Sequence, residues 1–271
     1  MVSAVLFITF FVLLVLNVPI SICLGLSSAA AILYSGTSLT IVATNIYSGI
    51  SKFLLLAIPF FVLSGNIMAK AGISTRLIRF VDTCVGHRKG GIANVCIIVA
   101  CFFGAISGSG PATVMAIGTL LVPAMEENGY PPRSAAGLTA MAGALGPIIP
   151  PSIVMIVYGT TMSVSITKMF MGGVLPGLLI ALFLIITNQI ITRKFDLKVS
   201  QQHYTFGDLL RITWRALPTL LLPVLILGGI YGGVVTPTES ATVGCVYSLV
   251  LALVYRKINV KSFIEILRKT V

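Results

Sequence analysis

Two apolar stretches of this chain are interrupted by glycine, serine and proline, residue types that end helices and leave backbone groups free. The first interruption is Ser107-Gly108-Ser109-Gly110-Pro111, and the second is Pro147-Ile148-Ile149-Pro150-Pro151-Ser152. Non-helical backbone is tolerated at membrane depth only where protein covers it or water reaches it. Two breaks close together in sequence are typical of a midplane ion or solute site in a secondary transporter. We therefore expect a site built from helix ends.

The two breaks predict complementary chemistry. At the first, we expect Ser109 to cap a helix that begins near Pro111, whose free N–H groups would attract an anion. At the second, prolines deprive nearby carbonyl oxygens of helical partners, so that those oxygens can replace the hydration shell of Na⁺. A proton relay would usually need an intramembrane carboxylate or histidine, and residues 92–125 and 135–168 contain no Asp or Glu. Sodium is the favoured coupling ion.

Structural explanations of both breaks stay open. The first can be a flexible membrane turn, with Gly104 and Gly108 forming a small-residue packing face. The second can be a simple proline kink. A third motif, Thr236-Pro237-Thr238-Glu239, is best explained as a structural cap, in which Thr236 and Glu239 form a capping box around Pro237.

Other chemistry finds little support. The sequence lacks GxxxxGK[ST], GxGxxG and GxSxG, and its only histidines, His87 and His203, are expected in loops. The five cysteines show no CxxC or metal-ligand spacing, so we expect no transition-metal site and no other cofactor. We predict that the chain is not an enzyme.

Composition places these motifs in a polytopic membrane protein. The 271 residues are 57% hydrophobic and only 9% charged, with a mean hydropathy of +1.05. Of the 18 Lys and Arg residues, 15 fall in three groups of five, at 70–89, 193–215 and 256–269. That spacing is typical of cytoplasmic loops, so the net charge of +11 reflects topology and does not indicate nucleic-acid binding.

The expected fold is all-α. A hairpin at 92–125 would enter and leave the membrane on one side, and 135–162 would cross as a broken helix. Five regions follow: N-terminal scaffold spans (1–69), a cytoplasmic interfacial helix (70–89), a transport region (90–168), a span and second interfacial helix (169–215), and two further spans (216–271). Within them we expect spans at 1–16, 18–34, 53–69, 169–192, 216–235 and 240–255, an outer loop at 35–51, and interfacial helices at 73–85 and 206–215.

These residues resemble the large membrane subunit (DctM-like permease) of the tripartite ATP-independent periplasmic (TRAP) transporters. The resemblance rests on IPFFVLSG (58–65), GAISGSGPAT (104–113), PAMEENGY (123–130), AGLTA (136–140), GPIIPPS (146–152) and GVVTPTESA (233–241). It implies an inverted-repeat, elevator-type fold in the bacterial inner membrane. It also implies sodium-coupled uptake of a carboxylate-bearing solute, of the C4-dicarboxylate or sugar-acid type. The implied partners are a periplasmic binding protein, a small membrane subunit and the lipid bilayer.

By that resemblance, the two breaks belong to the family's first hairpin and first broken helix and together form a Na⁺ site beside the solute. The implied site residues are Ser107, Gly108, Ser109, Gly110, Pro111, Thr113, Gly143, Gly146, Pro147, Pro150, Pro151 and Ser152.

In one respect the chain departs from the family pattern. The family normally carries a second, inverted repeat, and this sequence stops at Val271 before one, so we expect a fragment, a split product or a truncated chain. Two alternatives stay open: a related sodium-coupled anion or carboxylate symporter that needs no binding protein, and a non-transporting membrane scaffold.

Overall fold

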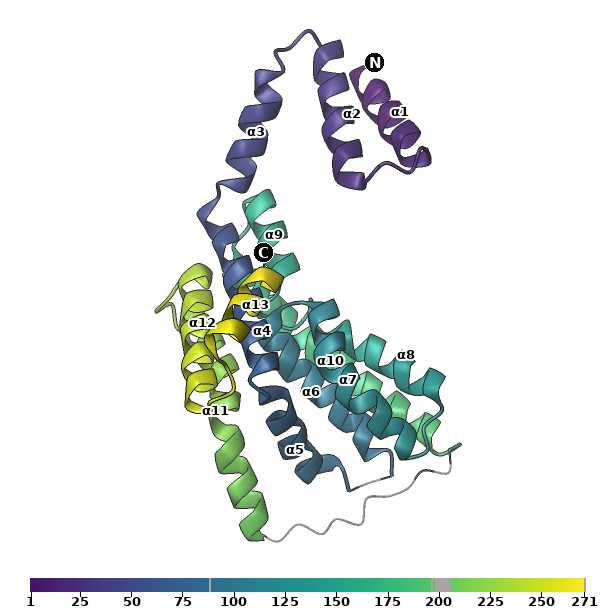
Figure 1. Cartoon of the computed structure of the whole chain (residues 1–271). Coiled ribbons are helices and arrows are strands. Elements are labelled where there is room, and N and C mark those ends of the chain that lie inside the picture. The colour runs from purple at the N-terminus through teal and green to yellow at the C-terminus, as the bar shows by residue number, and fades with distance from the viewer. Residues whose placement is uncertain (88, 196, 198–205, 271) are drawn as a thin grey trace. The chain divides into compact units, whose positions relative to one another are not determined.

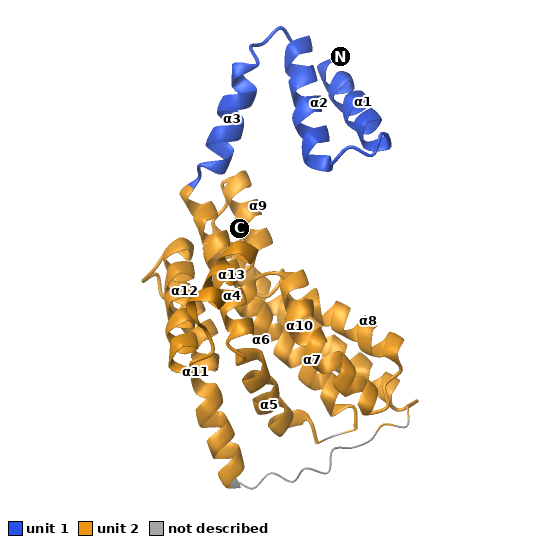
Figure 2. Cartoon of the chain, viewed as in Figure 1, with its two compact units in different colours: residues 1–52 blue, residues 53–271 orange. Residues whose placement is uncertain are grey.

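The computed structural model of the chain describes residues 1–87, 89–195, 197 and 206–270. Within these residues it contains thirteen α-helices, one short 3₁₀ helix and no strand (Figure 1). The chain divides into two compact units, residues 1–52 and 53–271 (Figure 2). The predicted all-α class is confirmed.

The first unit contains α1 (Val2–Val15), α2 (Ile20–Tyr34) and α3 (Thr40–Ile50), and α1 packs on α2. Helices of 14 and 15 residues are about 21–23 Å long, less than a hydrocarbon core of about 30 Å. Helix α3 lies inside the stretch 35–51 that we expected to be a loop. That expectation was wrong because polarity without charge does not prevent a helix where no proline interrupts it.

The second unit holds the remaining helices. They are the 3₁₀ helix η1 (Phe53–Leu56), α4 (Ala57–Lys70), α5 (Ile73–Val85), α6 (Gly91–Ser107), α7 (Gly110–Glu127), α8 (Pro132–Gly143), α9 (Ile153–Met162), α10 (Ile166–Thr192), α11 (Phe206–Tyr231), α12 (Pro237–Val254) and α13 (Val260–Thr270).

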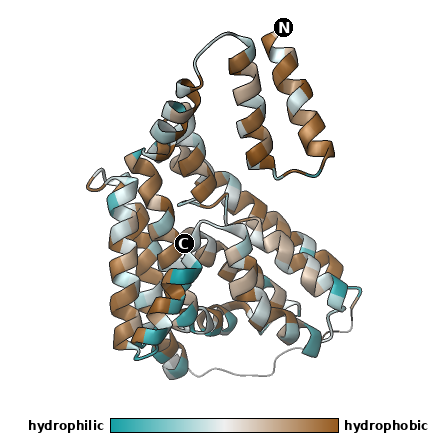
Figure 3. Ribbon diagram, turned by 45° about the horizontal axis from the view of Figure 1, so that its top comes forward, coloured by the Kyte–Doolittle hydropathy of each residue, from teal (hydrophilic) through white to brown (hydrophobic). Residues whose placement is uncertain are grey.

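Four segments of the second unit are long and apolar enough to cross a membrane: Phe53–Lys70, Ile166–Thr192, Gly207–Tyr231 and Pro237–Val254. In Figure 3 hydrophobic residues dominate the helices, whereas hydrophilic residues gather in α13 beside the C-terminus. The chain is therefore a multi-pass membrane protein by length and composition. Whether α6 and α7 re-enter from one side, and whether the fold repeats, stay predictions.

Two hydrophobic clusters hold the second unit together. One surrounds α6, which is buried along most of its length and packs on α5, α7, α8 and α10. The other joins α4 to α11 and α12. Small residues let α4 approach α12 closely, and the Ser64 hydroxyl bonds the Ser248 hydroxyl at 2.7 Å. Because α6 packs on several other helices, its position is fixed, and the first sequence break begins in its last turn.

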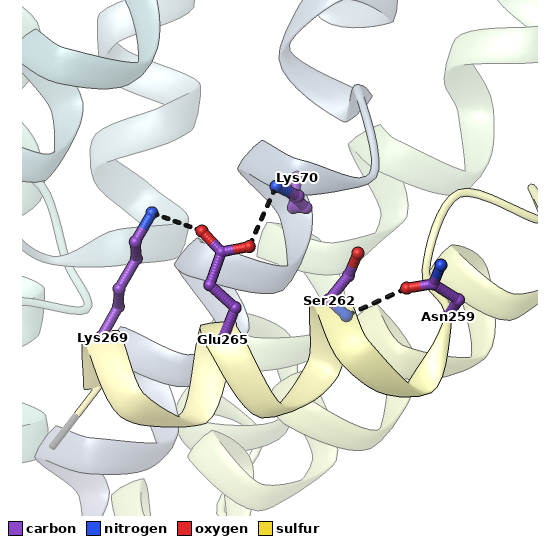
Figure 4. Close-up of polar contacts among 5 residues, drawn as sticks. All are labelled: Lys70, Asn259, Ser262, Glu265 and Lys269. Atoms are coloured by element: carbon purple, nitrogen blue, oxygen red, sulfur yellow. Dashed lines mark hydrogen bonds and ion pairs between the residues drawn. The ribbon is translucent and has the colours of Figure 1, made fainter.

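The C-terminal region differs from the prediction in two ways. Residues 206–231 form one continuous helix, so the boundary expected at residues 215/216 falls inside α11. Helix α13 was not predicted. It packs on α4, where the Glu265 carboxylate accepts hydrogen bonds from Lys70 (3.4 Å) and Lys269 (3.0 Å), and Asn259 caps its first turn by accepting from the Ser262 N–H (Figure 4).

Candidate functional site

The first break is a two-residue turn between α6 and α7. Helix α6 ends at Ser107, and Gly108 turns the chain with φ of 62°, a left-handed conformation that favours glycine. Ser109 is the N-cap of α7, and its hydroxyl accepts a hydrogen bond from the Ala112 N–H at 3.5 Å. Pro111 lies in the first turn, where its missing N–H costs nothing. The cap that the sequence predicted is present.

Two buried hydroxyl groups brace this turn. The Ser107 and Thr113 oxygens lie 3.2 Å apart and are almost completely inaccessible to solvent. Both donate to the carbonyl oxygen of Ser109, Thr113 at 2.7 Å and Ser107 at 3.4 Å. The turn is therefore held from inside, and the orientation of the Ser109 carbonyl is fixed.

The second break separates α8 from α9. Helix α8 ends at Gly143, and Ser152 is the N-cap of α9, where its hydroxyl accepts from the Met155 N–H at 3.3 Å. The same hydroxyl donates to the carbonyl oxygen of Pro147 at 2.6 Å. The capping role of Ser152 was not predicted, although a serine just before an apolar run is the ordinary sequence signal for an N-cap.

The two breaks interlock backbone to backbone. The Ile153 N–H donates to the Gly108 carbonyl oxygen at 3.2 Å. A β-carbon on Gly108 would lie 2.7 Å from the Pro151 carbonyl oxygen, and one on Gly146 would lie 2.8 Å from the Ser109 carbonyl oxygen. A β-carbon on Gly110 would come within 3.2 Å of the Gly143 carbonyl oxygen. The structure therefore brings the twelve residues implied by the resemblance into one region.

Several carbonyl oxygens where the two breaks meet accept no hydrogen bond from a described residue. Those of Ala105, Ile106 and Ser107 lie in the last turn of α6, beyond the reach of its intrahelical N–H groups. The Gly108 N–H bonds back to Gly104, and the Ser109 N–H points to the Ser107 hydroxyl at 3.4 Å. Among the described residues, no N–H or O–H group donates to the carbonyl oxygens of the buried Pro150 and Pro151. These neutral oxygens are potential ligands of a hard cation.

A cavity of about 590 Å³ lies beside the N-terminus of α7. Its walls come from α4, α5, α6 and α7, and Ser107, Ser109 and Pro111 form part of them. The Ser74 hydroxyl is buried in this wall and has no partner among the described residues. The other polar side chains lining the cavity are Asn66, Thr75 and Thr119.

The sequence analysis missed Asn66, Ser74, Thr75 and Thr119. Asn66 carried a usable signal, because it is the only amide in the apolar run 53–69, and such polar residues usually mark function. In the structure its amide donates to the Thr270 hydroxyl at 3.1 Å. Ser74 and Thr75 belong to the amphipathic helix α5, in which polar residues are ordinary and carried no signal.

The remaining sequence motifs have structural roles. Thr236 caps α12, its hydroxyl accepting from the Glu239 N–H at 3.3 Å while the Glu239 carboxylate accepts from the Thr236 N–H at 2.8 Å. Pro237 occupies the first turn of that helix. In the part of the chain that the structure describes, no three His, Cys, Asp or Glu side chains are grouped as metal ligands.

Comparison with known proteins identifies the family of the chain. The model of the family "Tripartite ATP-independent periplasmic transporter, DctM component" matches residues 7–271. The C4-dicarboxylate TRAP transporter large permease protein DctM of Vibrio cholerae is 45% identical over 259 residues, 94% of this chain and 57% of that protein. The isethionate TRAP transporter permease protein DctMQ of Oleidesulfovibrio alaskensis is 42% identical, over 96% of this chain and 41% of that protein.

The sialic acid TRAP transporter large permease protein SiaM of Vibrio cholerae is 37% identical, over 90% of this chain and 57% of that protein. The chain thus spans between two fifths and three fifths of the length of these relatives. Since the family model covers nearly the whole chain, the protein belongs to the DctM family of TRAP transporter components, which are membrane permeases and not enzymes.

Proposed function

We propose that this chain forms part of a multi-pass inner-membrane permease for sodium-coupled uptake of a carboxylate-bearing solute. A periplasmic binding protein would deliver the solute, and a small membrane subunit would accompany the permease. Family membership and the relatives named for C4-dicarboxylate, isethionate and sialic acid transport support this, since all three solutes are anions. The relative named DctMQ supports a small-subunit partner.

The interlocked breaks are the observation that carries the proposal. The carbonyls of Ala105, Ile106 and Ser107, which accept no hydrogen bond from a described residue, lie at the C-terminus of α6, which bears partial negative charge. The Pro151 carbonyl belongs to the opposing break, next to Gly108. A Na⁺ ion held between the two breaks would take the place of the missing hydrogen-bond donors and would link one break to the other. Sodium binding would therefore order the C-terminus of α6 and the break between α8 and α9 together.

The cavity beside α7 is proposed to hold the solute. Its volume of about 590 Å³ suits a small organic anion with some water. Ser109 and Pro111, in the first turn of α7, line it, and a helix N-terminus favours negative charge. The unpaired Ser74 hydroxyl lies in the same wall and offers a further donor. The cation would thus bind at the C-terminus of α6 and the anion at the N-terminus of α7. These two helix ends are joined by a two-residue turn, so the bound ions would be close enough to stabilise each other.

The test is uptake into proteoliposomes by a transporter that contains this chain, its small membrane subunit and its binding protein. Gly146→Ala places a methyl group against the Ser109 backbone, whereas Gly137→Ala, in α8, meets no atom within 4 Å. We expect Gly146→Ala to raise the half-saturating Na⁺ concentration at least tenfold and Gly137→Ala to leave it within twofold. An unchanged Na⁺ dependence in correctly folded Gly146→Ala transporter would refute the sodium assignment.

Two further uptake experiments test the solute site and the role of the binding protein. Ser74→Ala should raise the KM for the solute while leaving the Na⁺ dependence intact, and an unchanged KM would remove Ser74 from the site. Omission of the binding protein should abolish uptake. Uptake that persists without it would support a symporter that works alone and would contradict the proposed delivery.

A further inference from the structure

Three arginine side chains from two helices converge on a cleft away from the interlocked breaks. The cleft has a volume of about 410 Å³ and is lined by Arg76 and Arg79 of α5 and by Ile212, Arg215 and Ala216 of α11. Helices α5 and α11 pack directly on each other, so the cleft is a feature of the fold within the second unit. More than half of its lining residues carry a positive charge, which is unusual between two helices of a membrane protein.

No carboxylate is among the residues that line the cleft. The two ion pairs of Glu265, with Lys70 and with Lys269, do not involve an arginine of the cleft. Like charges gathered in one concavity repel each other unless an anion neutralises them. Guanidinium groups are also the side chains best suited to a phosphate, because each offers parallel N–H donors in a fixed plane.

One of the three arginines is held in place before any ligand binds. The Arg76 guanidinium carbon lies 3.5 Å from the centre of the ring of Tyr255, the residue that follows the last turn of α12, which is a cation–π contact. Stacking uses the face of the guanidinium and leaves its N–H edges available to a ligand. The contact therefore reduces the entropy that Arg76 would lose on binding an anion.

The position of the cleft along α11 indicates where the anion comes from. Arg215 is the last charged residue before the uncharged stretch 216–238. The preceding residue, Trp214, is 76% exposed, and it lines a second hollow together with Arg211 and Arg215. An exposed tryptophan among arginines at the end of an apolar stretch is typical of the level of lipid headgroups. The cleft thus opens where phosphate groups of the bilayer lie.

We propose that Arg76, Arg79 and Arg215 form a binding site for a phosphate-type anion, supplied by the headgroup of an anionic phospholipid. Basic pockets between membrane helices bind such headgroups through charge and hydrogen bonds. A lipid phosphate seated here would join α5 to α11 and neutralise the cleft. The site is separate from the proposed sodium and solute sites and does not depend on them.

The test is native mass spectrometry of the full chain in detergent, with phosphatidylglycerol and phosphatidylcholine offered at equal concentration. The chain should retain phosphatidylglycerol preferentially. The triple variant Arg76→Gln, Arg79→Gln, Arg215→Gln should lose at least fivefold of that preference. The matched control Lys257→Gln, Lys261→Gln, Arg268→Gln removes the same charge outside the cleft and should change the preference less than twofold. Equal losses in both variants, or no preference in the parent chain, would overturn the site.

Two additional measurements cover a misfolded triple variant and distinguish lipid from soluble phosphate. Should the triple variant fail to fold, the double variant Arg79→Gln, Arg215→Gln changes only exposed side chains and should still lose most of the preference. Inorganic phosphate is then added as a competitor, in large molar excess over the lipid. Retention of phosphatidylglycerol would assign the site to lipid. Displacement that requires the three arginines would support the phosphate site but assign it to a soluble anion, which would overturn the lipid source.

Discussion

A β-carbon added to Gly104 would lie 2.9 Å from the α-carbon of Gly146. The last turn of α6 and the break between α8 and α9 therefore touch through their backbones, with no space for a side chain on either one. This contact brings together two sequence breaks that are 40 residues apart, and it explains why glycine stands where their backbones meet.

Gly146→Ala is predicted to destabilise the chain. Its methyl group would lie 2.8 Å from the Ser109 carbonyl oxygen, so one break must move away from the other, at a cost of about 1–3 kcal/mol. Gly137→Ala meets no neighbour within 4 Å and should be neutral or stabilising, by up to about 1 kcal/mol. Thermal unfolding in detergent compares the two variants. Equal melting temperatures of the two variants would show that the contact between the two breaks tolerates an added methyl group.

A second prediction concerns the polar network at the start of α6. The buried Asn188 amide donates to the Asn94 side-chain oxygen at 2.8 Å and to the Gly90 carbonyl oxygen at 3.2 Å, and it accepts from the Tyr130 hydroxyl at 3.4 Å. Asn188→Leu leaves these groups buried without partners and should cost about 1–3 kcal/mol.

The neighbouring half-buried Gln189 provides the control for that variant, because its side chain makes no hydrogen bond to a described residue. Gln189→Leu should change stability by less than half as much. A double-mutant cycle between Asn94 and Asn188 should give a coupling energy of at least about 0.5 kcal/mol. Additive effects of the two substitutions would contradict the network.

Helix positions near the breaks could be predicted well from sequence, since glycine and proline constrain the backbone locally. The predicted amphipathic helix at 73–85 coincides with α5, and the capped start of α7 at Ser109 was predicted from residue type alone. Local signals sufficed wherever a cap or a periodic apolar face decided the structure.

Other features depend on tertiary contacts. Helix α13 carried a signal that the sequence analysis missed, because Val260, Phe263, Ile264 and Leu267 repeat at helical spacing. Its packing on α4 and the pair between Lys70 and Glu265, 195 residues apart in sequence, could not be predicted from that pattern. The network around Asn188 likewise joins residues that are 58 to 98 positions apart. The continuity of α11 through Arg215 was missed because a change in hydropathy marks a change of environment and need not end a helix.

Topology is the third prediction. The three groups of Lys and Arg place residues 70–89, 193–215 and 256–269 in the cytoplasm, and position 200, in one of them, lies outside the described residues. In a background without the five native cysteines, an impermeant thiol reagent should label Ser38→Cys in intact cells. It should label Lys261→Cys only after the membrane is opened. The reverse pattern would invert the proposed orientation.

The last prediction is a pH dependence of the contact between α13 and α4. Hydrogen bonding and charge from Lys269, with a further contribution from Lys70, hold the pKa of the Glu265 carboxyl below its ordinary value of 4.5. A lowered pKa in the folded state means that the charged form stabilises the contact. The contribution is therefore complete above pH 4.5 and is lost as the pH falls through the lowered pKa.

Hydrogen exchange of the α13 amides, measured for the parent chain and for Glu265→Gln at each pH, isolates this contribution because intrinsic exchange cancels in the comparison. At pH 7 the parent should be better protected. The difference should disappear at strongly acidic pH, and it should shrink in 1 M salt, where the screening length is about 3 Å. The effect should be modest, because both ion pairs are about half exposed. A difference in protection that persists unchanged at acidic pH would show that Glu265 stabilises α13 by packing and not by its charge.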